Sequence, residues 1–193
     1  MIIKKDITEP TLNTLRKKYK NKKIGLVHGV FDLFHYGHLL HLKKAKSLCD
    51  VLVVSITSDK FVQKAPGRPI YNENQRKKML SSLNFVNHVL LSNNKTSINI
   101  IKSLRPNFYF KGNEYSEEKK DFSGGIKIER KMVEKFGGKV LFTNEKTSSS
   151  TKLINRFSDE LDEKTKKYLK NLKNQIDFNK MKFLVDKTAK LKT

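Results

Sequence analysis

The chain has 193 residues, 41 of them lysine or arginine and 19 aspartate or glutamate, so its net charge is +22 (41 − 19) at pH 7. This length allows one principal domain. No stretch approaches the roughly 20 apolar residues that cross a bilayer, and the start lacks a signal-peptide core, so a cytoplasmic protein without a membrane span is expected. The single cysteine, Cys49, excludes an internal disulfide and agrees with a reducing compartment.

The basic excess consists mostly of lysine and is spread along the whole chain. This distribution favours a solvated lysine-rich surface over a dedicated nucleic-acid face. A basic nucleic-acid-binding module without catalysis stays open as the alternative function of another class. A positive surface would also attract small anionic substrates such as nucleotides and sugar phosphates.

Residues 1–22 are predicted to form a leading helix, because Leu12, Leu15 and Tyr19 lie at helical spacing. Short apolar runs that read as buried strands follow at 24–27, 51–56, 86–91, 108–110 and 140–142. Helical patterns lie between and after them at 39–48, 73–83, 97–104 and 126–136. This alternation predicts an α/β fold, a Rossmann-like doubly wound parallel sheet of about five strands, in a domain spanning 23–155. Residues 156–193 are predicted to form a helical tail or linker.

A polar turn separates the first of these strands from its helix. It reads Gly29-Val30-Phe31-Asp32-Leu33-Phe34-His35-Tyr36-Gly37-His38. Helix N-termini bind anions through unpaired N–H groups and the macrodipole. His35 and His38 are one helical turn apart, with Gly37 between them, so both imidazoles are predicted to reach one phosphate. The alternatives are helix-capping or core histidines and a zinc site, for which no third ligand is apparent.

The pattern Gly29-x-Phe31-Asp32-x-x-His35-x-Gly37-His38 resembles the signature of the cytidylyltransferase-like nucleotidylyltransferases, relatives of the HIGH superfamily. The resemblance implies transfer of a nucleotidyl group from an NTP to a phosphate acceptor, with release of pyrophosphate. It implies catalytic roles for His35 and His38, and Mg²⁺ carried by the nucleotide without side-chain ligands. Asp32 is predicted to fix the turn by accepting N–H bonds or to lie near the substrate. The residues assigned to nucleotide binding here are Gly29, Val30, Phe31 and Gly37.

A loop punctuated by proline and glycine follows the second strand. Family members carry a lysine near this part of the loop, so Lys64 is predicted to neutralise phosphate charge during catalysis, with Lys60 as the alternative. Arg68 and Arg76 belong to a pattern similar to that of heptose-phosphate nucleotidylyltransferases and are predicted as possible substrate or phosphate contacts. Arg76 has a second interpretation, as the ion-pair partner of Glu73.

Two later segments complete the predicted site. Lys111, Gly112 and Glu114 resemble the Lys-Gly-Gly-Asp-Tyr turn of the heptose-phosphate branch and are predicted to bind the base or ribose, with a structural turn as the alternative. A serine run resembles the family's phosphate-binding motif after the last strand, although on composition alone such a run is a flexible linker. Its residues are Ser148, Ser149, Ser150 and Thr151.

The chain departs from the best-known cytidylyltransferases before this serine run. Asn144-Glu145-Lys146-Thr147 stands where those enzymes carry an arginine. This departure weakens the case for a CTP:glycerol-3-phosphate-type enzyme, which stays as the alternative, and it leaves ATP or CTP open. The preferred acceptor is a sugar or polyol phosphate of the heptose-phosphate type, as in the ADP-heptose synthase branch. The resemblance also implies a homodimer, and a sugar kinase as a possible partner domain or protein.

Overall fold

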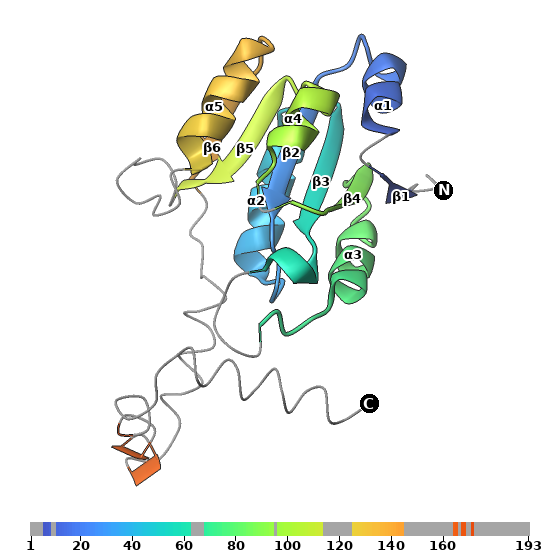
Figure 1. Cartoon of the computed structure of the whole chain (residues 1–193). Coiled ribbons are helices and arrows are strands. Elements are labelled where there is room, and N and C mark those ends of the chain that lie inside the picture. Colours follow the sequence, from blue (N-terminus) through green and yellow to red (C-terminus); the bar gives the residue numbers. More distant parts are fainter. Residues whose placement is uncertain are drawn as a thin grey trace.

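A twisted sheet of six parallel strands forms the centre of the computed structural model, which describes residues 6–8, 11–62, 68–94, 96–113, 125–144, 164, 165, 167, 168 and 171 (Figure 1). The strands are β1 (Asp6–Ile7), β2 (Ile24–Gly29), β3 (Val51–Thr57), β4 (His88–Ser92), β5 (Phe108–Gly112) and β6 (Lys139–Thr143). Their order across the sheet is β1-β4-β3-β2-β5-β6, and every neighbouring pair is parallel. The predicted α/β doubly wound architecture is therefore confirmed.

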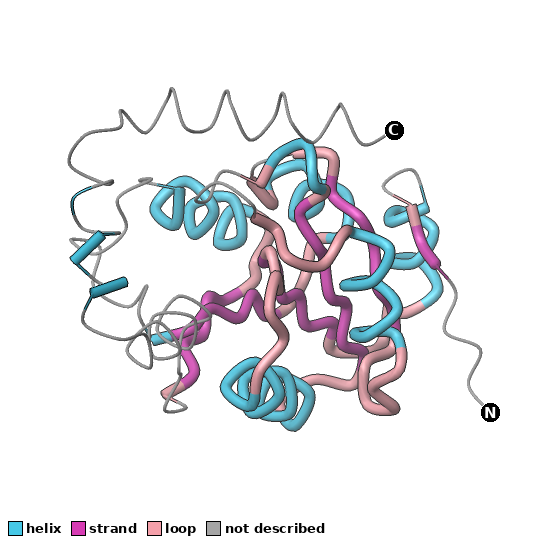
Figure 2. Tube along the Cα trace, turned by 90° about the horizontal axis from the view of Figure 1, so that it is seen from below, coloured by secondary structure: helices cyan, strands magenta, loops and turns pink. Residues whose placement is uncertain are grey.

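Helices cover both faces of this sheet, as the view from below shows (Figure 2). They are α1 (Leu12–Lys18), α2 (Tyr36–Ser47), α3 (Glu73–Ser81), α4 (Ile98–Leu104) and α5 (Gly125–Lys135). One apolar cluster joins α1, α4 and α5 to side chains such as Leu26 and Tyr109, and a second joins α2 and α3 to side chains such as Val27 and Phe110. Adjacent residues of a strand point to opposite faces, so β2 and β5 each contribute to both clusters.

The order of the strands creates a switch point between β2 and β5. From β2 the chain proceeds through β3 to β4 on one side, and then returns to place β5 on the other side of β2. The two strands pair in register, Gly25 with Phe108 and Val27 with Phe110. In open parallel sheets ligands bind beyond the carboxyl ends of the strands at such a point. The turn that carries His35 and His38 and the end of β5 therefore flank the expected binding crevice.

The five predicted runs all form strands, and each strand continues past the carboxyl end of its apolar run, with β2 and β5 extending furthest. β2 continues through His28 and Gly29, and β5 through Lys111 and Gly112. These polar or small residues at the carboxyl ends of strands lie at the switch point.

The leading segment also differs from its prediction, since α1 covers only seven residues of it. The short strand β1, paired with β4, precedes this helix and was not expected. In the predicted tail, the described residues Lys164, Thr165, Lys167, Tyr168 and Asn171 are helical. Among the helices of the described part, none is both long and apolar enough to span a membrane.

Cys49 is a buried thiol just after α2. Its Sγ donates to the carbonyl oxygen of Ala45 at 3.3 Å. Burial raises the pKa of the thiol to about 11. The protonated thiol is a poor nucleophile, so Cys49 belongs to the core and not to the site.

Candidate functional site

The turn between β2 and α2 depends on two residues with unusual local requirements. Phe31 adopts a left-handed backbone conformation with φ of 52°. Its ring is buried against Gly29, where an added Cβ would lie 3.2 Å from the ring. A side chain at position 29 would therefore require the Phe31 ring to shift by a few tenths of an ångström.

The structure brings His35 and His38 together at the start of α2. His35 is the N-cap residue, and its Nδ1 accepts from the backbone N–H of His38 at 3.4 Å. The Nδ1 of His38 accepts in return from the backbone N–H of His35, also at 3.4 Å. The two rings stack with centroids 3.8 Å apart, and Phe31 and Phe34 contact the ring of His38 at 5.3 and 5.7 Å.

This reciprocal capping determines the tautomer of both rings. When Nδ1 accepts, the proton of a neutral imidazole is on Nε2, so Nε2 is the donor side of each ring. The capping role that the sequence left open as an alternative is therefore present, and it orients the rings instead of competing with a phosphate-binding role. Gly37, between them, is buried in the first helical turn. The N-terminus of α2 therefore combines backbone N–H groups with the Nε2–H donors of the two imidazoles.

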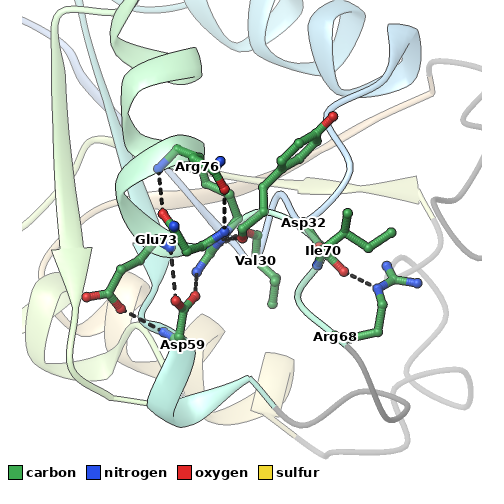
Figure 3. Close-up of polar contacts among 10 residues, drawn as sticks. Val30, Asp32, Asp59, Arg68, Ile70, Glu73 and Arg76 are labelled. Carbon is green, nitrogen blue, oxygen red and sulfur yellow. Dashed lines mark hydrogen bonds and ion pairs between the residues drawn. The ribbon is translucent and has the colours of Figure 1, made fainter. Parts of the chain in front are cut away.

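Asp32 connects this turn to the segment that precedes α3 (Figure 3). Its buried carboxylate accepts from the backbone N–H of Ile70 at 2.5 Å and forms an ion pair with Nε of Arg68. Asp32 therefore accepts an N–H bond, as predicted, but from a distant segment. The Arg68 side chain is only 10% exposed, and its Nη2 is buried without a hydrogen-bond partner among the described residues.

Arg76 lies beneath the same turn and is completely buried, with 0% of its side chain exposed. Its Nη2 pairs with Asp59 at 2.6 Å, its Nη1 donates to the carbonyl oxygen of Val30 at 2.5 Å, and its Nε donates to that of Tyr71 at 3.0 Å. Both earlier interpretations of Arg76 need correction. Its carboxylate partner is Asp59 and not Glu73, and its guanidinium supports the turn through protein acceptors instead of facing a phosphate.

Lys111 and Gly112 lie at the end of β5, on the other side of the switch point. The Nζ of Lys111 is 3.1 Å from Oε2 of Glu129 and 5.1 Å from the centroid of the Tyr109 ring. Sequence reasoning missed Glu129, which lies 18 residues further along the chain in α5. Its spacing from the buried residues Ile126 and Val133 was a usable signal, because it places a carboxylate on the apolar stripe of that helix.

Some of the predicted site residues are not among those that the structure describes. Lys64, Glu114 and the serine run at 148–151 lie outside the described residues. Lys60, the alternative to Lys64, is exposed in the short 3₁₀ helix η2 (Asp59–Phe61), with its Nζ 5.8 Å from the Phe61 ring.

His41, one turn beyond His38, is buried and contacts the end of β6. Its Nδ1 lies 2.6 Å from Oγ1 of Thr143. Burial, with a smaller contribution from the charge of Lys111, lowers the pKa of His41 to about 4. His41 is therefore a neutral core histidine that is hydrogen-bonded within the protein. Within the described ranges, no three histidine, cysteine or acidic side chains are grouped so that they could hold a metal ion.

Comparisons with known proteins agree with this geometry. The family model described as Cytidylyltransferase-like matches residues 26–156. The bifunctional protein HldE of Geobacter metallireducens is 35% identical over 143 residues, and that of Campylobacter jejuni subsp. doylei is 40% identical over 117 residues. These alignments cover 72% and 60% of this chain but only 28% and 25% of the relatives, so the chain spans about a quarter of their length.

A solved structure shares the fold. The lipopolysaccharide core biosynthesis protein from Thermoplasma volcanium superposes with a TM-score of 0.52 at 24% identity. The match covers 65% of this chain and 99% of that chain. The sheet and its helices are therefore the arrangement found in that protein.

Proposed function

Because the chain belongs to the cytidylyltransferase-like family and is an enzyme of the nucleotidyltransferase type, we propose that it transfers a nucleotidyl group from ATP or CTP to a sugar or polyol phosphate. The products are a nucleoside diphosphate sugar or polyol and pyrophosphate. The observation that carries this proposal is the stacked His35–His38 pair, whose Nε2 atoms are donors at the N-terminus of α2, beside the switch point of the sheet.

In the proposed reaction, an oxygen of the acceptor's phosphate attacks the α-phosphorus of the NTP in line. The bond between the α-phosphorus and the oxygen that bridges to the β-phosphate breaks, and that oxygen leaves with pyrophosphate. The Nε2–H groups of His35 and His38 donate to the α-phosphate oxygens and the leaving oxygen as negative charge accumulates. Because the capping hydrogen bonds fix both rings before substrate arrives, the donors need no reorganisation during the reaction.

Other predicted residues would act on the rest of the triphosphate. Lys64 would neutralise charge on the phosphates from its loop, and the serine run at 148–151 would hold the β- and γ-phosphates. The backbone of the turn would contact the nucleotide, at Gly29, Val30, Phe31 and Gly37. These roles rest on the family resemblance and on the position of the turn at the switch point.

We propose Mg²⁺ as a cofactor that the nucleotide brings with it. Two carboxylates at or beside the turn already have cationic and N–H donors: Asp32 bonds Arg68 and Ile70, and Asp59 bonds Arg76 and the backbone N–H of Glu73. These groups do not fit a metal-ligand set. When bound, the ion would supply charge neutralisation on the phosphates.

Arg68 is the residue that we propose for the acceptor. Its Nε is fixed by Asp32, which belongs to the catalytic turn, while its Nη2 has no described partner. A guanidinium held in this way is suited to a phosphate monoester, because it offers donors in a fixed plane. The motifs that resemble the ADP-heptose synthase branch, together with the likeness to bifunctional HldE proteins, support a heptose-phosphate-like acceptor. A homodimer and a partner sugar kinase are further proposals from that likeness.

A screen for pyrophosphate release tests the proposal. ATP, CTP, GTP and UTP are each offered with a panel of heptose, hexose and polyol phosphates, with MgCl₂ present. We expect release with ATP or CTP and one class of acceptor, and none without acceptor. Release with CTP and glycerol 3-phosphate alone would favour the alternative cytidylyltransferase. Absence of release with every pair, together with salt-sensitive binding of DNA or RNA, would overturn the enzyme in favour of a nucleic-acid-binding module.

A further inference from the structure

A buried carboxylate fixes the end of β5 at the switch point. Glu129 is 4% exposed and has four donors on its two oxygens. Its Oε1 accepts from the backbone N–H and the hydroxyl of Ser97, at 3.1 and 2.8 Å. Its Oε2 accepts from the hydroxyl of Tyr109 at 3.0 Å and from Nζ of Lys111 at 3.1 Å. We call Glu129, Ser97, Tyr109 and Lys111 the Glu129 network.

This network joins three elements of one face. Glu129 belongs to α5, Ser97 is the residue before α4, and Tyr109 and Lys111 come from β5. Tyr109 belongs to the apolar cluster that contains residues of α1, α4 and α5, and Lys111 follows it by two residues on the same side of the strand. The Glu129 network is therefore the polar end of that cluster, at the carboxyl edge of the sheet.

The charge of Lys111 is used within the protein. Its side chain is only 13% exposed, its ammonium pairs with Glu129, and the Tyr109 ring lies under it. It also lies on the face of α4 and α5, whereas His35 and His38 begin the helix that packs on the other face. These two facts argue against Lys111 as a direct partner of the triphosphate.

Stability alone does not explain such a pair. Removing two charges from water costs free energy that their attraction often fails to recover, and apolar replacements of buried ion pairs are frequently neutral or stabilising. A network with every oxygen occupied does, however, restrict the backbone to one position. Here the restricted backbone is the end of β5, where Gly112 directly follows Lys111, on the other side of the switch point from the turn that carries His35 and His38.

We propose that Glu129 is a positioning residue for nucleotide binding: through Lys111 and Tyr109 it holds the end of β5 where the nucleoside part of the NTP is recognised. This role rests on the proposed function and adds to it a residue that touches neither the phosphates nor the acceptor. Loss of the network would then loosen the nucleoside subsite and leave the histidine donors in place.

The kinetic test uses Glu129→Gln, which keeps the shape of the side chain and removes its charge. We expect the KM for the NTP to rise about tenfold while kcat stays within about twofold, because uniform binding is lost and transition-state contacts are kept. Tyr109→Phe, which removes one donor, should raise the same KM by about threefold. Glu134→Gln is the matched control, since it removes the same charge from an exposed position of α5 and should change nothing.

A double-mutant cycle tests whether Glu129 acts through Lys111. In Lys111→Met/Glu129→Gln the KM should equal that of Glu129→Gln alone, because both changes break one network. An unchanged KM in Glu129→Gln, or a fall in kcat larger than the rise in KM in Lys111→Met, would overturn the proposal. Urea unfolding of each variant establishes that the folded protein is being compared.

Binding of ATP and CTP, measured by calorimetry, separates this proposal from the proposed function. If the wild-type protein binds a nucleotide but releases no pyrophosphate, the transfer reaction is wrong, and an unchanged or about tenfold higher Kd in Glu129→Gln still decides the role of Glu129. If the wild-type protein binds neither nucleotide, both proposals are overturned. If it turns over normally and Glu129→Gln has the wild-type KM and Kd, only the positioning role fails.

Discussion

The two sides of the switch point use polar groups in opposite ways. At the β2–α2 turn, the two imidazoles contact backbone N–H groups and aromatic rings, and the ion pairs of Asp32 and Arg76 lie around and beneath them. At the end of β5, Lys111 and Glu129 neutralise each other directly. Under the two proposals this difference is a division of labour: the turn between β2 and α2 supplies donors for the reaction, and the end of β5 supplies a fixed position for the nucleotide.

Removal of a histidine donor should produce the largest effect on turnover. His38→Ala should lower kcat by about 10² to 10³, the range seen when one donor to a developing oxyanion is removed. The free energy of unfolding should fall by no more than about 1 kcal/mol, the usual cost of a lost cap. Pyrophosphate release and urea unfolding measure the two quantities. Lys43→Ala, at an exposed position of the same helix, is the control, and unchanged turnover in His38→Ala would contradict the mechanism.

Arg76 tests whether the support beneath the histidine turn is structural. Arg76→Met should lower the free energy of unfolding by about 3 kcal/mol, because Asp59 and the Val30 carbonyl lose their partner in a buried setting. Arg76→Lys should be nearly as harmful, since an ammonium cannot reproduce three directed N–H bonds. Urea unfolding measures both variants against Lys78→Ala, an exposed residue of the same helix. A stable Arg76→Met protein with a raised KM for the NTP would instead restore the phosphate contact first predicted from the sequence.

The same contrast explains what the sequence could predict. The strands β2, β3, β4, β5 and β6 were found because buried parallel strands are runs of apolar residues, and the histidine turn because its chemistry is local in the chain. Strand β1 has only two residues, Asp6 and Ile7, and is defined by its pairing with β4. A segment this short has no periodic pattern from which a strand could be predicted. The ends of β2 and β5 were assigned to turns because their residues are polar or small. Such residues occur at the carboxyl edge of the sheet, where the ligand is expected to bind.

The residues of the candidate site also differ in how far they could be predicted, according to whether their neighbours are close in the sequence. His35, His38 and Gly37 lie within four residues, and their joint position follows from one helical turn. The partners of Arg76 and Lys111 lie 17 and 18 residues away in sequence, on other elements, and become neighbours only when the sheet forms. Long-range pairing of charges is decided by tertiary packing, which local spacing does not encode.

His41 links the two sides, because it belongs to α2 but is affected by Lys111. Its pKa of about 4 is below the ordinary value of 6.5, so the unfolded chain takes up the proton more readily than the folded protein. The neutral state of His41 contributes fully to the free energy of unfolding above pH 6.5. This contribution is lost as the pH falls from 6.5 towards 4, and at pH 5 the loss is about 2 kcal/mol. Urea unfolding at pH 7 and pH 5 should show this loss in the wild type, and it should shrink in His41→Gln, which does not titrate there. An equal loss in both proteins would assign it to other groups.

The smallest expected effect concerns the acceptor, and it tests whether the histidine side also holds the second substrate. Arg68→Lys keeps the positive charge beside Asp32 but loses the guanidinium fork, so the KM for the acceptor phosphate should rise about tenfold, while kcat and the KM for the NTP stay close to wild type. Arg105→Lys is the same substitution at an exposed residue before β5, at the opposite edge of the sheet, and should be silent. Initial rates of pyrophosphate release with each substrate varied in turn measure these constants. A rise in the KM for the NTP instead would place Arg68 on the nucleotide and leave acceptor recognition to the β5 side.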